Sequence, residues 1–305
     1  MESSILTVIV LTYNEATHIK RCLSSVSDLE ARFVVVDSYS SDNTKEIALS
    51  CGAEVYQNPF VNHAKQFDWA LNNCGIGTDW VLRLDADEII DDELLRNIRS
   101  FIEADGEGCN GAIFHRRHVF LGRWVRYGGR YPLPMLRLFR RGCAHIEQRW
   151  MDEHIVLDKG HSTTLAGGFY DENINSVGWF IGKHNGYATR EMVDIKLREL
   201  YGAGSEITEN TGLSIRLKRF LKEKLYMGLP YFVRPVLYFM YRYFIQLGFL
   251  DGMRGFAYHF MQGLWYRALV DLKCLEVDRI WQKCSSIEEK HKALEKYSGL
   301  DLEGM

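Results

Sequence analysis

The amino-acid sequence predicts an α/β fold over residues 1–202 and a helical region over residues 203–305. Short apolar runs rich in β-branched residues recur in the N-terminal half, as in strands that are buried on both faces of a sheet. Segments whose apolar residues repeat at helical spacing separate these runs. Strands that alternate with helices form right-handed crossovers, so we expect a mostly parallel sheet with flanking helices. The alternation stops near Gly202, where we place the boundary.

Three strands and four helices are expected in the first part of this pattern. Asn14, Asp42 and the pair Asp91–Asp92 stand where helix caps are expected, and Gly52 is placed to end the second helix. The expected strands cover residues 5–11, 33–36 and 80–84, and the expected helices cover 19–26, 42–52, 64–74 and 94–102.

The composition is that of an ordinary globular protein, with 305 residues, 47% hydrophobic and 25% charged. It excludes collagen-like, coiled-coil and wholly disordered chains. The net charge of −3 gives no reason to expect a nucleic-acid partner. Seven cysteines without a CxxC pair favour neither a disulfide framework nor a zinc ribbon, and they fit a reducing cytoplasm. The apolar run Ile5–Leu11 is too short for a signal peptide, and no Lys or Arg precedes it.

Polar side chains follow each of the three expected strands. Tyr-Asn-Glu stands at 13–15, Asp-Ser at 37–38 and Asp-Ala-Asp at 85–87. In open α/β sheets, ligands bind beyond the carboxyl ends of the strands. These three segments therefore predict a binding site at one edge of the sheet.

The acidic run Asp85-Ala86-Asp87-Glu88 is the strongest chemical signal. Carboxylate oxygens suit Mg²⁺ or Mn²⁺, which takes one or two carboxylates and completes its shell with substrate phosphates. Acidic triplets also arise by chance and cap helices, but the later Asp91–Asp92 pair is better placed to cap the next helix. Asp37 is the second signal, since a carboxylate after a strand can accept hydrogen bonds from a ribose or a base. The alternative for Asp37 is a turn-forming role.

The segment Gly106–Gly142 is locally basic. It contains eight arginines and no acidic residue after Glu107. We expect either a solvated surface loop or an anion-binding rim beside the site, because the planar guanidinium suits phosphate. The arginines are Arg116, Arg117, Arg123, Arg126, Arg130, Arg137, Arg140 and Arg141.

Three motifs in the first 100 or so residues carry a family resemblance. VIVLTYNEATHIKRCL, VVVDSYSSDNT and DWVLRLDADE, in this order, resemble family 2 glycosyltransferases with the GT-A fold. NPFVNHAKQFDWAL, GGRYPLPMLRLFRRG and HIEQRWMDEHIV resemble, more narrowly, bacterial enzymes of the lipopolysaccharide-core β-1,4-glucosyltransferase type. The resemblance implies a nucleotide-sugar donor, usually a UDP-sugar, a divalent metal, and inversion at the anomeric carbon.

The resemblance also assigns residues to the donor. Asp87 is implied as the main metal ligand, with Asp85 touching the metal shell or the ribose. No Gly-rich phosphate loop follows the first strand, so the metal is expected to carry more of the diphosphate recognition. The implied nucleotide contacts are Thr12, Tyr13, Glu15, Asp37, Lys65, Arg83, Asp85 and Ala86.

A general base is expected in the acidic pair Asp152-Glu153, where the family often places it after the DxD motif. The order is reversed from the more usual Glu-Asp, which leaves the choice between the two open. We favour Glu153 narrowly, by alignment of position, and a solvated acidic turn is the alternative. His154 and His184 are candidate third metal ligands or structural histidines. Trp124, Trp150 and Trp179 are candidates for stacking on sugar rings or for ordinary core positions.

The C-terminal region is expected to associate with an anionic membrane surface. Residues 215–250 contain seven basic residues and one acidic residue, interleaved with leucine and aromatics. Arg234 and Arg242 leave apolar runs far shorter than the ~20 residues that a spanning helix needs. A basic amphipathic helix in the interface fits better. The alternative is a helical subdomain that packs on the catalytic domain or forms a dimer, so an oligomer is allowed.

Three functions follow from these observations. The first is a glycosyltransferase, peripheral on the cytoplasmic inner face of the membrane, that moves a hexose, glucose favoured, to a lipid-linked or lipopolysaccharide acceptor. The second is a sugar-phosphate nucleotidyltransferase, which should carry a Gly-rich, Arg-containing loop where TYNEA stands. The third is a noncatalytic sugar-nucleotide-binding or scaffold protein, in which two acidic motifs need not coexist. We favour the first.

Overall fold

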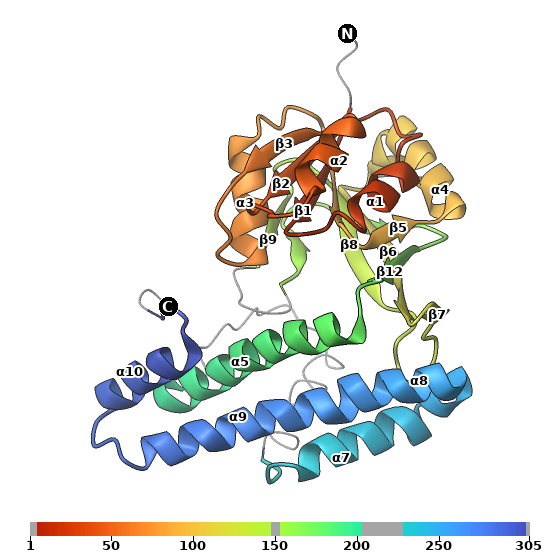
Figure 1. Cartoon of the computed structure of the whole chain (residues 1–305). Helices are drawn as coiled ribbons and strands as arrows, with labels where there is room; N and C mark the ends of the chain where they lie inside the picture. The colour runs from red at the N-terminus through yellow and green to blue at the C-terminus, as the bar shows by residue number, and fades with distance from the viewer. Residues whose placement is uncertain (1–4, 148–152, 203–227, 303–305) are drawn as a thin grey trace. The chain divides into compact units, whose positions relative to one another are not determined.

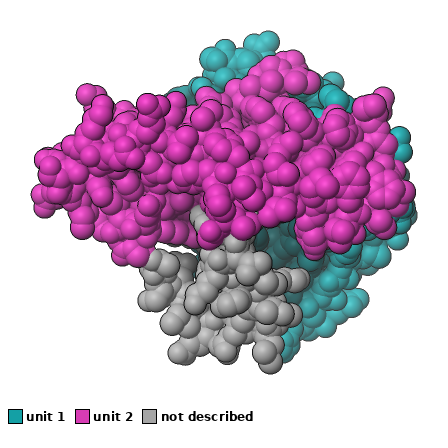
Figure 2. Space-filling view, turned by 90° about the horizontal axis from the view of Figure 1, so that it is seen from below, with its two compact units in different colours: residues 1–175 teal, residues 176–305 magenta. Residues whose placement is uncertain are grey.

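The computed structural model describes residues 5–147, 153–202 and 228–302, and its chain forms two compact units, residues 1–175 and 176–305 (Figures 1 and 2). The sequence placed the boundary at 202. The structure places α5 (Val177–Tyr201) in the second unit, because apolar side chains of this helix, such as Met192, pack in the same core as Val270 and Cys274. The end of the βα pattern therefore lies one helix before the expected position.

The first unit is built on a ten-stranded mixed sheet with the order β3-β2-β1-β4-β8-β6-β12-β5, and β7 and β11 pair with β6. The first four strands in this order are parallel, and antiparallel pairs begin at β4–β8. The sequence predicted β1, β2 and β4 of these four and missed β3. The strands of the parallel part are β1 (Leu6–Thr12), β2 (Ala31–Asp37), β3 (Glu54–Gln57) and β4 (Trp80–Asp85).

The mixed part of the sheet comes from the region that the sequence did not divide into strands. A separate two-stranded sheet pairs β9 with β10. The remaining strands are β5 (Glu88–Ile90), β6 (Gly111–Phe120), β7 (Arg123–Trp124), β8 (Pro134–Arg140), β9 (Ala144–Ile146), β10 (Ile155–Leu157), β11 (Ser162–Thr164) and β12 (Phe169–Glu172).

The four expected helices of the first unit are present, but two expected caps differ. Asp42 lies one residue before the N-cap Asn43 and accepts a hydrogen bond from Thr44 N at 3.0 Å. Asp91 caps its helix, since its carboxylate accepts a hydrogen bond from Leu94 N at 2.8 Å. Asn14 is not a cap: it adopts a positive φ of 56°, its side chain accepts from Ser41 N, and the first helix begins only after His18. The helices are α1 (Ile19–Ser25), α2 (Thr44–Ser50), α3 (His63–Asn73) and α4 (Asp92–Glu103), with a 3₁₀ turn η1 (Asp105–Gly108).

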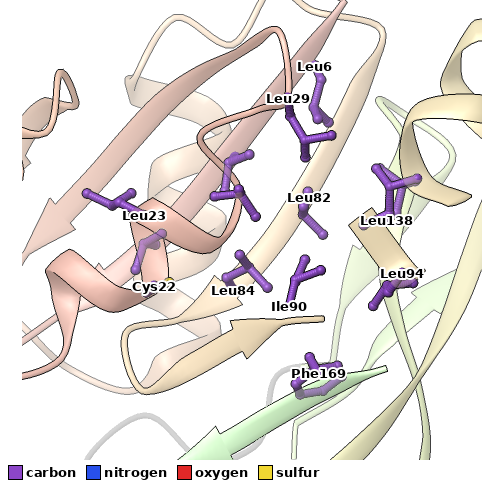
Figure 3. Close-up of a cluster of buried hydrophobic side chains, with 14 of the residues drawn as sticks. Leu6, Cys22, Leu23, Leu29, Leu82, Leu84, Ile90, Leu94, Leu138 and Phe169 are labelled. Atoms are coloured by element: carbon purple, nitrogen blue, oxygen red, sulfur yellow. The ribbon is translucent and has the colours of Figure 1, made fainter. Parts of the chain in front are cut away.

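Alternate residues of β1 enter two apolar cores, one on each face of the sheet. Val8 and Val10 pack with α1, α2 and α4 in the core that Figure 3 shows in part, with Leu82 and Leu84 of β4. Ile9 packs on the opposite face, in the core formed with α3. A central strand that is buried on both faces is held in a fixed register, because a slip of one residue would exchange its two faces.

The second unit is helical, as expected. It carries its own core, in which Lys196 is buried and forms ion pairs with Asp278 and Glu199. Among the helices that the structure describes, none combines the length and apolarity needed to cross a bilayer. Besides α5, its elements are α7 (Val233–Met240), η3 (Tyr241–Ile245), η4 (Gly248–Asp251), α8 (Gly252–Tyr258), η5 (His259–Trp265), α9 (Tyr266–Trp281) and α10 (Ile287–Ser298).

Candidate active site

The sheet register brings the predicted acidic residues to one edge. Thr12 pairs with Asp37 across β1 and β2, and Leu11 pairs with Asp85 across β1 and β4. These three strands are parallel, so their carboxyl ends meet at the same edge. The convergence that the sequence predicts is therefore present.

Asp37 is fully buried at this edge and is held by its own loop. Its carboxylate accepts hydrogen bonds from Thr12 Oγ1 at 3.0 Å and from Ser40 N at 2.9 Å. The bond to Ser40 is the turn-forming role that the sequence left as an alternative. These hydrogen bonds fix the orientation of the carboxylate.

The loop after β1 places Tyr13 and Glu15 differently. The Tyr13 side chain is exposed. Glu15 accepts a hydrogen bond from His18 Nδ1 at 2.6 Å, while Nε2 of the same buried ring accepts from Ile174 N at 3.0 Å. This pattern assigns the ring proton to Nδ1. His18 therefore positions Glu15 and ties its loop to the segment after β12, a role that the sequence did not indicate.

Asp85 lies between two buried arginines. Arg137 Nη2 is 3.1 Å from Asp85 Oδ2, and Arg83 Nη2 is 3.5 Å from Asp85 Oδ1. Burial opposes ionisation of this carboxyl, but the guanidinium groups of Arg137 and Arg83, with His63 at the start of α3, outweigh it and hold its pKa well below the ordinary value. Asp85 is therefore anionic and firmly oriented.

Glu88 shares the same arginine and was not predicted as a site residue. It is 2% exposed, forms an ion pair with Arg137, and accepts from Asp85 N at 3.0 Å. Burial and the charge of Asp85 raise the pKa of Glu88 above its ordinary value, although the guanidinium of Arg137 acts to lower it. The role of Arg137 as the partner of these carboxylates was also missed. The signal for it was an arginine at the centre of the apolar strand PMLRLFR, because a buried guanidinium requires an acidic partner.

Asp87 is half-buried and faces the end of β12. Asn173 Nδ2 donates to Asp87 Oδ2 at 3.1 Å, and Glu172 N donates to the Asp87 carbonyl at 3.0 Å. Ala86, between the two aspartates, is buried. Asn173 was not predicted, and its position after β12 follows from the pairing of β12 with β5.

The oxygen ligands at this edge suit a Mg²⁺ or Mn²⁺ ion that also binds a diphosphate. Asp87 offers hard carboxylate oxygens, whereas Asp85 is already neutralised by arginines. Across residues 5–147, 153–202 and 228–302, no three His, Cys, Asp or Glu side chains are grouped so as to hold a metal ion by themselves. One or two carboxylates completed by substrate phosphates are the usual protein contribution for Mg²⁺.

Glu153 is brought to the DxD motif by Arg83. Arg83 Nη2 lies 3.1 Å from Glu153 Oε1, and both residues line a small hollow with Arg137 and His154. Asp152 lies outside the described residues. The alternative of a solvated turn is wrong for Glu153, whose side chain is 11% exposed and paired.

The two candidate histidine ligands lie in different units. The exposed ring of His154 is 3.3 Å from Glu147 Oε2. His184 lies in α5 of the second unit, where it stacks on Phe180 and bonds to the Phe180 carbonyl, which is the structural role the sequence left open.

The remaining candidates are Lys65 and the three tryptophans, and they lie in different elements. Lys65 is exposed in the first turn of α3, and its amide completes the helix cap with Asn62. Trp124 belongs to β7, where its ring contacts Tyr131 edge-on at 4.9 Å. Trp179 lies in α5, and Trp150 lies outside the described residues.

The arginine-rich segment is not the solvated surface loop offered as one alternative, because much of it forms β6 and β8. Carboxylates from distant parts of the chain pair with it, because strand pairing places β6 and β8 beside acidic loops. Within the described residues, such ion pairs join Arg116 with Asp171, Arg117 with Asp91, Arg137 with Asp85 and Glu88, and Arg140 with Asp105.

Comparisons with known proteins agree with this picture. Residues 7–155 match the family model described as Glycosyl transferase family 2. An uncharacterized glycosyltransferase of Rickettsia bellii is 40% identical over 85 residues, 28% of each chain, so the match spans under a third of that relative. The succinoglycan biosynthesis protein ExoA of Rhizobium meliloti is 29% identical over 186 residues, covering 50% of this chain and 56% of ExoA.

Two solved structures are also similar. S. aureus TarS 1–349 gives a TM-score of 0.47 at 17% identity and covers 96% of this chain and 91% of its own. The glucosyl-3-phosphoglycerate synthase of Mycobacterium tuberculosis, crystallised with Mn²⁺, UDP and glucosyl-3-phosphoglycerate, gives 0.31 at 20% identity and covers 38% of this chain and 45% of its own.

The first unit is an α/β domain with a mixed sheet, flanking helices and an acidic site at the carboxyl edge of its parallel strands. Its residues 7–155 belong to glycosyl transferase family 2, as the sequence resemblance implied. The narrower resemblance to lipopolysaccharide-core glucosyltransferases stays a prediction.

Proposed function

We propose that this protein transfers a hexose, glucose favoured, from a UDP-sugar to a lipid-linked or lipopolysaccharide acceptor, with inversion at the anomeric carbon. The observation that carries the proposal is the convergence of Asp37, Asp85 and Asp87 at one sheet edge of a family 2 glycosyltransferase domain. Glu153 adds a fourth carboxylate, joined to that edge through Arg83.

The donor nucleoside is assigned to the first two strand ends. The buried carboxylate of Asp37 receives the uridine, supported by Thr12, while exposed Tyr13 and the His18-bound Glu15 flank it. Arg83, Asp85 and Ala86 continue the site along β4, and Lys65 contacts the nucleotide from α3. The fixed side chains of Asp37 and Asp85 favour binding because little side-chain entropy remains to be lost.

Asp87 is assigned as the main ligand of Mg²⁺ or Mn²⁺, with Asp85 and His154 as further candidates. A divalent cation bound there stabilises the negative charge that develops on the departing diphosphate. The chain contributes the orientation of Asp87, which Asn173 fixes through its side-chain amide.

Glu153 is assigned as the general base, with Asp152 as the alternative. The acceptor hydroxyl oxygen forms the new bond to the anomeric carbon while the bond to the diphosphate oxygen breaks. The hydroxyl proton passes to the Glu153 carboxylate, and the nucleoside diphosphate leaves. A base on the face opposite the leaving group gives inversion in a single displacement.

The acceptor and the location are proposed together. ExoA is by its name a protein of succinoglycan biosynthesis, and this supports a saccharide acceptor that is assembled on a carrier. A lipid-linked acceptor places the enzyme at a membrane surface, here the cytoplasmic inner face. The basic composition of residues 215–250 supports an anionic surface as partner, although residues 215–227 lie outside the described part.

The test is a panel of nucleotide sugars, scored first by thermal shift with and without Mn²⁺ and then by release of the nucleoside diphosphate with saccharide acceptors. We expect UDP-glucose with Mn²⁺ to give the largest shift and UDP to be released in step with glucosylated product of inverted configuration. A shift without turnover on any acceptor would indicate a noncatalytic binding protein. Pyrophosphate release from a sugar phosphate and UTP would indicate a nucleotidyltransferase.

A further inference from the structure

The second unit presents a concentrated apolar surface on the segment from α7 to η5, which we call the hairpin surface. Fourteen large apolar side chains between residues 232 and 260 are at least 36% exposed. They are Phe232, Val233, Val236, Leu237, Met240, Tyr241, Phe244, Ile245, Leu247, Phe249, Leu250, Met253, Phe256 and Phe260. An exposed apolar patch of this density marks an interaction surface.

The most exposed side chains lie where the chain turns between η3 and α8. Ile245 is 73% exposed and Met253 is 80% exposed, and Leu247 and Leu250 between them are about half exposed. The turn is tightly built, because a Cβ at Gly248 would come within 2.7 Å of the His259 ring. These apolar side chains therefore project from an ordered turn.

Ordered contacts also support the hairpin surface from behind. Tyr243 stacks on Phe239 with ring centroids 5.3 Å apart and meets Phe256 edge-on at 5.6 Å. α7 packs against η5 and is joined to α9 by the buried pair of Arg234 and Asp271, whose Nε–Oδ1 distance is 2.6 Å. Arg234 is one of the seven basic residues of 215–250, and its charge is neutralised inside the unit.

The charges around the hairpin surface favour an anionic lipid surface as its occupant. Between residues 228 and 270 the chain has one acidic residue, Asp251, and that residue is 4% exposed. Arg254 is exposed beside Met253, and Arg242 donates to Tyr238 Oη at 2.6 Å. Apolar and aromatic side chains that insert, with arginines whose charged ends remain at headgroup depth, are the features of an interfacial membrane segment.

We infer that the hairpin surface inserts its turn, led by Ile245 and Met253, into the interfacial layer of an anionic membrane. This deepens the proposed membrane location by assigning a surface to it. Insertion is shallow, because the described helices include none that spans a bilayer and because Arg254 stays at the headgroups. The occupant is lipid, and a second copy of the chain is the competing outcome.

The experiment measures binding of the full-length protein to phosphatidylglycerol-containing vesicles and to pure phosphatidylcholine vesicles by co-sedimentation. The test variant is the double substitution Ile245→Gln and Met253→Gln. The matched control is Leu49→Gln with Ile287→Gln, two apolar residues that are 50% and 55% exposed on other helices. Thermal shift with UDP and Mn²⁺ serves as the readout of fold and donor binding.

We expect the wild-type protein and the control to bind anionic vesicles equally. The test variant should bind at least about tenfold more weakly, because two apolar side chains would no longer be transferred from water into the membrane. All three proteins should show the same thermal shift with UDP and Mn²⁺.

Undiminished vesicle binding by the test variant would overturn the inference while leaving the membrane location in place. A wild-type dimer that the test variant dissociates, without lipid binding by either, would show that a second copy covers the surface. Failure of every protein to bind vesicles, with donor binding intact, would remove the membrane location as well but not the transferase.

Discussion

Arg83 joins the two acidic motifs of the site, because its Nη2 lies 3.1 Å from Glu153 Oε1 and 3.5 Å from Asp85 Oδ1. Arg83 is 5% exposed and also lies over the ring of Phe67, so its position is fixed by packing. Two carboxylates that are 68 positions apart along the chain are thus held by one guanidinium. In the proposed mechanism, Arg83 would thereby fix the position of the general base relative to the residue that contacts the donor.

Replacing Glu153 by glutamine should lower kcat by ~10²–10⁴-fold, because an amide cannot take the acceptor proton. The KM for the nucleotide sugar should change little, since glutamine keeps the size of the side chain. Steady-state kinetics with saturating acceptor would measure both quantities.

Asp152→Asn and Glu147→Gln are the comparisons for this result. Glu147 contacts His154 and lies near Glu153 in sequence, so loss of its charge controls for a general electrostatic effect. If Asp152→Asn abolishes turnover while Glu153→Gln retains it, the base is Asp152. Full activity of both would remove this acidic pair from the mechanism.

Replacing Asp87 by alanine should abolish metal-dependent turnover and leave the fold intact, because this half-buried side chain contributes little apolar burial. The measurement is the thermal shift produced by Mn²⁺ with UDP, alongside the unfolding temperature without ligand. Asp92→Asn, in the first turn of α4, is the control and should behave as wild type. Retained turnover in Asp87→Ala would count against the assigned metal ligand.

Replacing Arg137 by methionine should destabilise the first unit by ~3–5 kcal/mol, the usual result when one partner of a buried ion pair is removed. Glu88 would lose its guanidinium partner, and Asp85 would keep only the longer contact with Arg83. Arg140→Met removes a pair with the exposed Asp105 and should cost ~0–1 kcal/mol. Urea unfolding of the two variants gives the comparison, and equal midpoints would show that the buried pairs are not a source of stability.

The sequence could predict three of the four parallel strands because β1, β2 and β4 are continuous apolar runs with caps and turns between them. It missed β3, which is short and largely not buried. It could not predict the mixed half, since Arg116, Arg117 and Arg137 interrupt the strand pattern there. Their acidic partners lie far away in sequence, and only the pairing of β6, β8 and β12 brings them close. The position of the acidic site was therefore predictable from the strand ends. The residues that support it, Glu88, Asn173 and His18, could be identified only from the tertiary structure.

Asp171 should make stability fall in acid. Burial opposes ionisation of this carboxyl, but Arg116 and His118 outweigh it and hold its pKa well below the ordinary value. A depressed native pKa gives a stabilising contribution that is complete above the unfolded value of about 3.9 and is lost as the pH falls below it. Urea unfolding between pH 7 and pH 3 should therefore show a smaller decline for Asp171→Asn than for wild type. Parallel declines would exclude this carboxylate as a source of acid sensitivity.

His18 should matter for both stability and donor binding. Its buried ring donates to Glu15 and accepts from Ile174 N, so His18→Phe keeps the bulk of the ring and removes both hydrogen bonds. Leaving the partly buried Glu15 carboxylate and the Ile174 N–H without this partner should lower the free energy of unfolding by ~1–3 kcal/mol. The KM for the donor should rise with kcat less affected, because Glu15 would lose its orientation beside the nucleoside. His161→Phe, at an exposed position, is the control. A fall in stability with an unchanged donor KM would mean that His18 serves only the fold and that Glu15 does not contact the nucleotide.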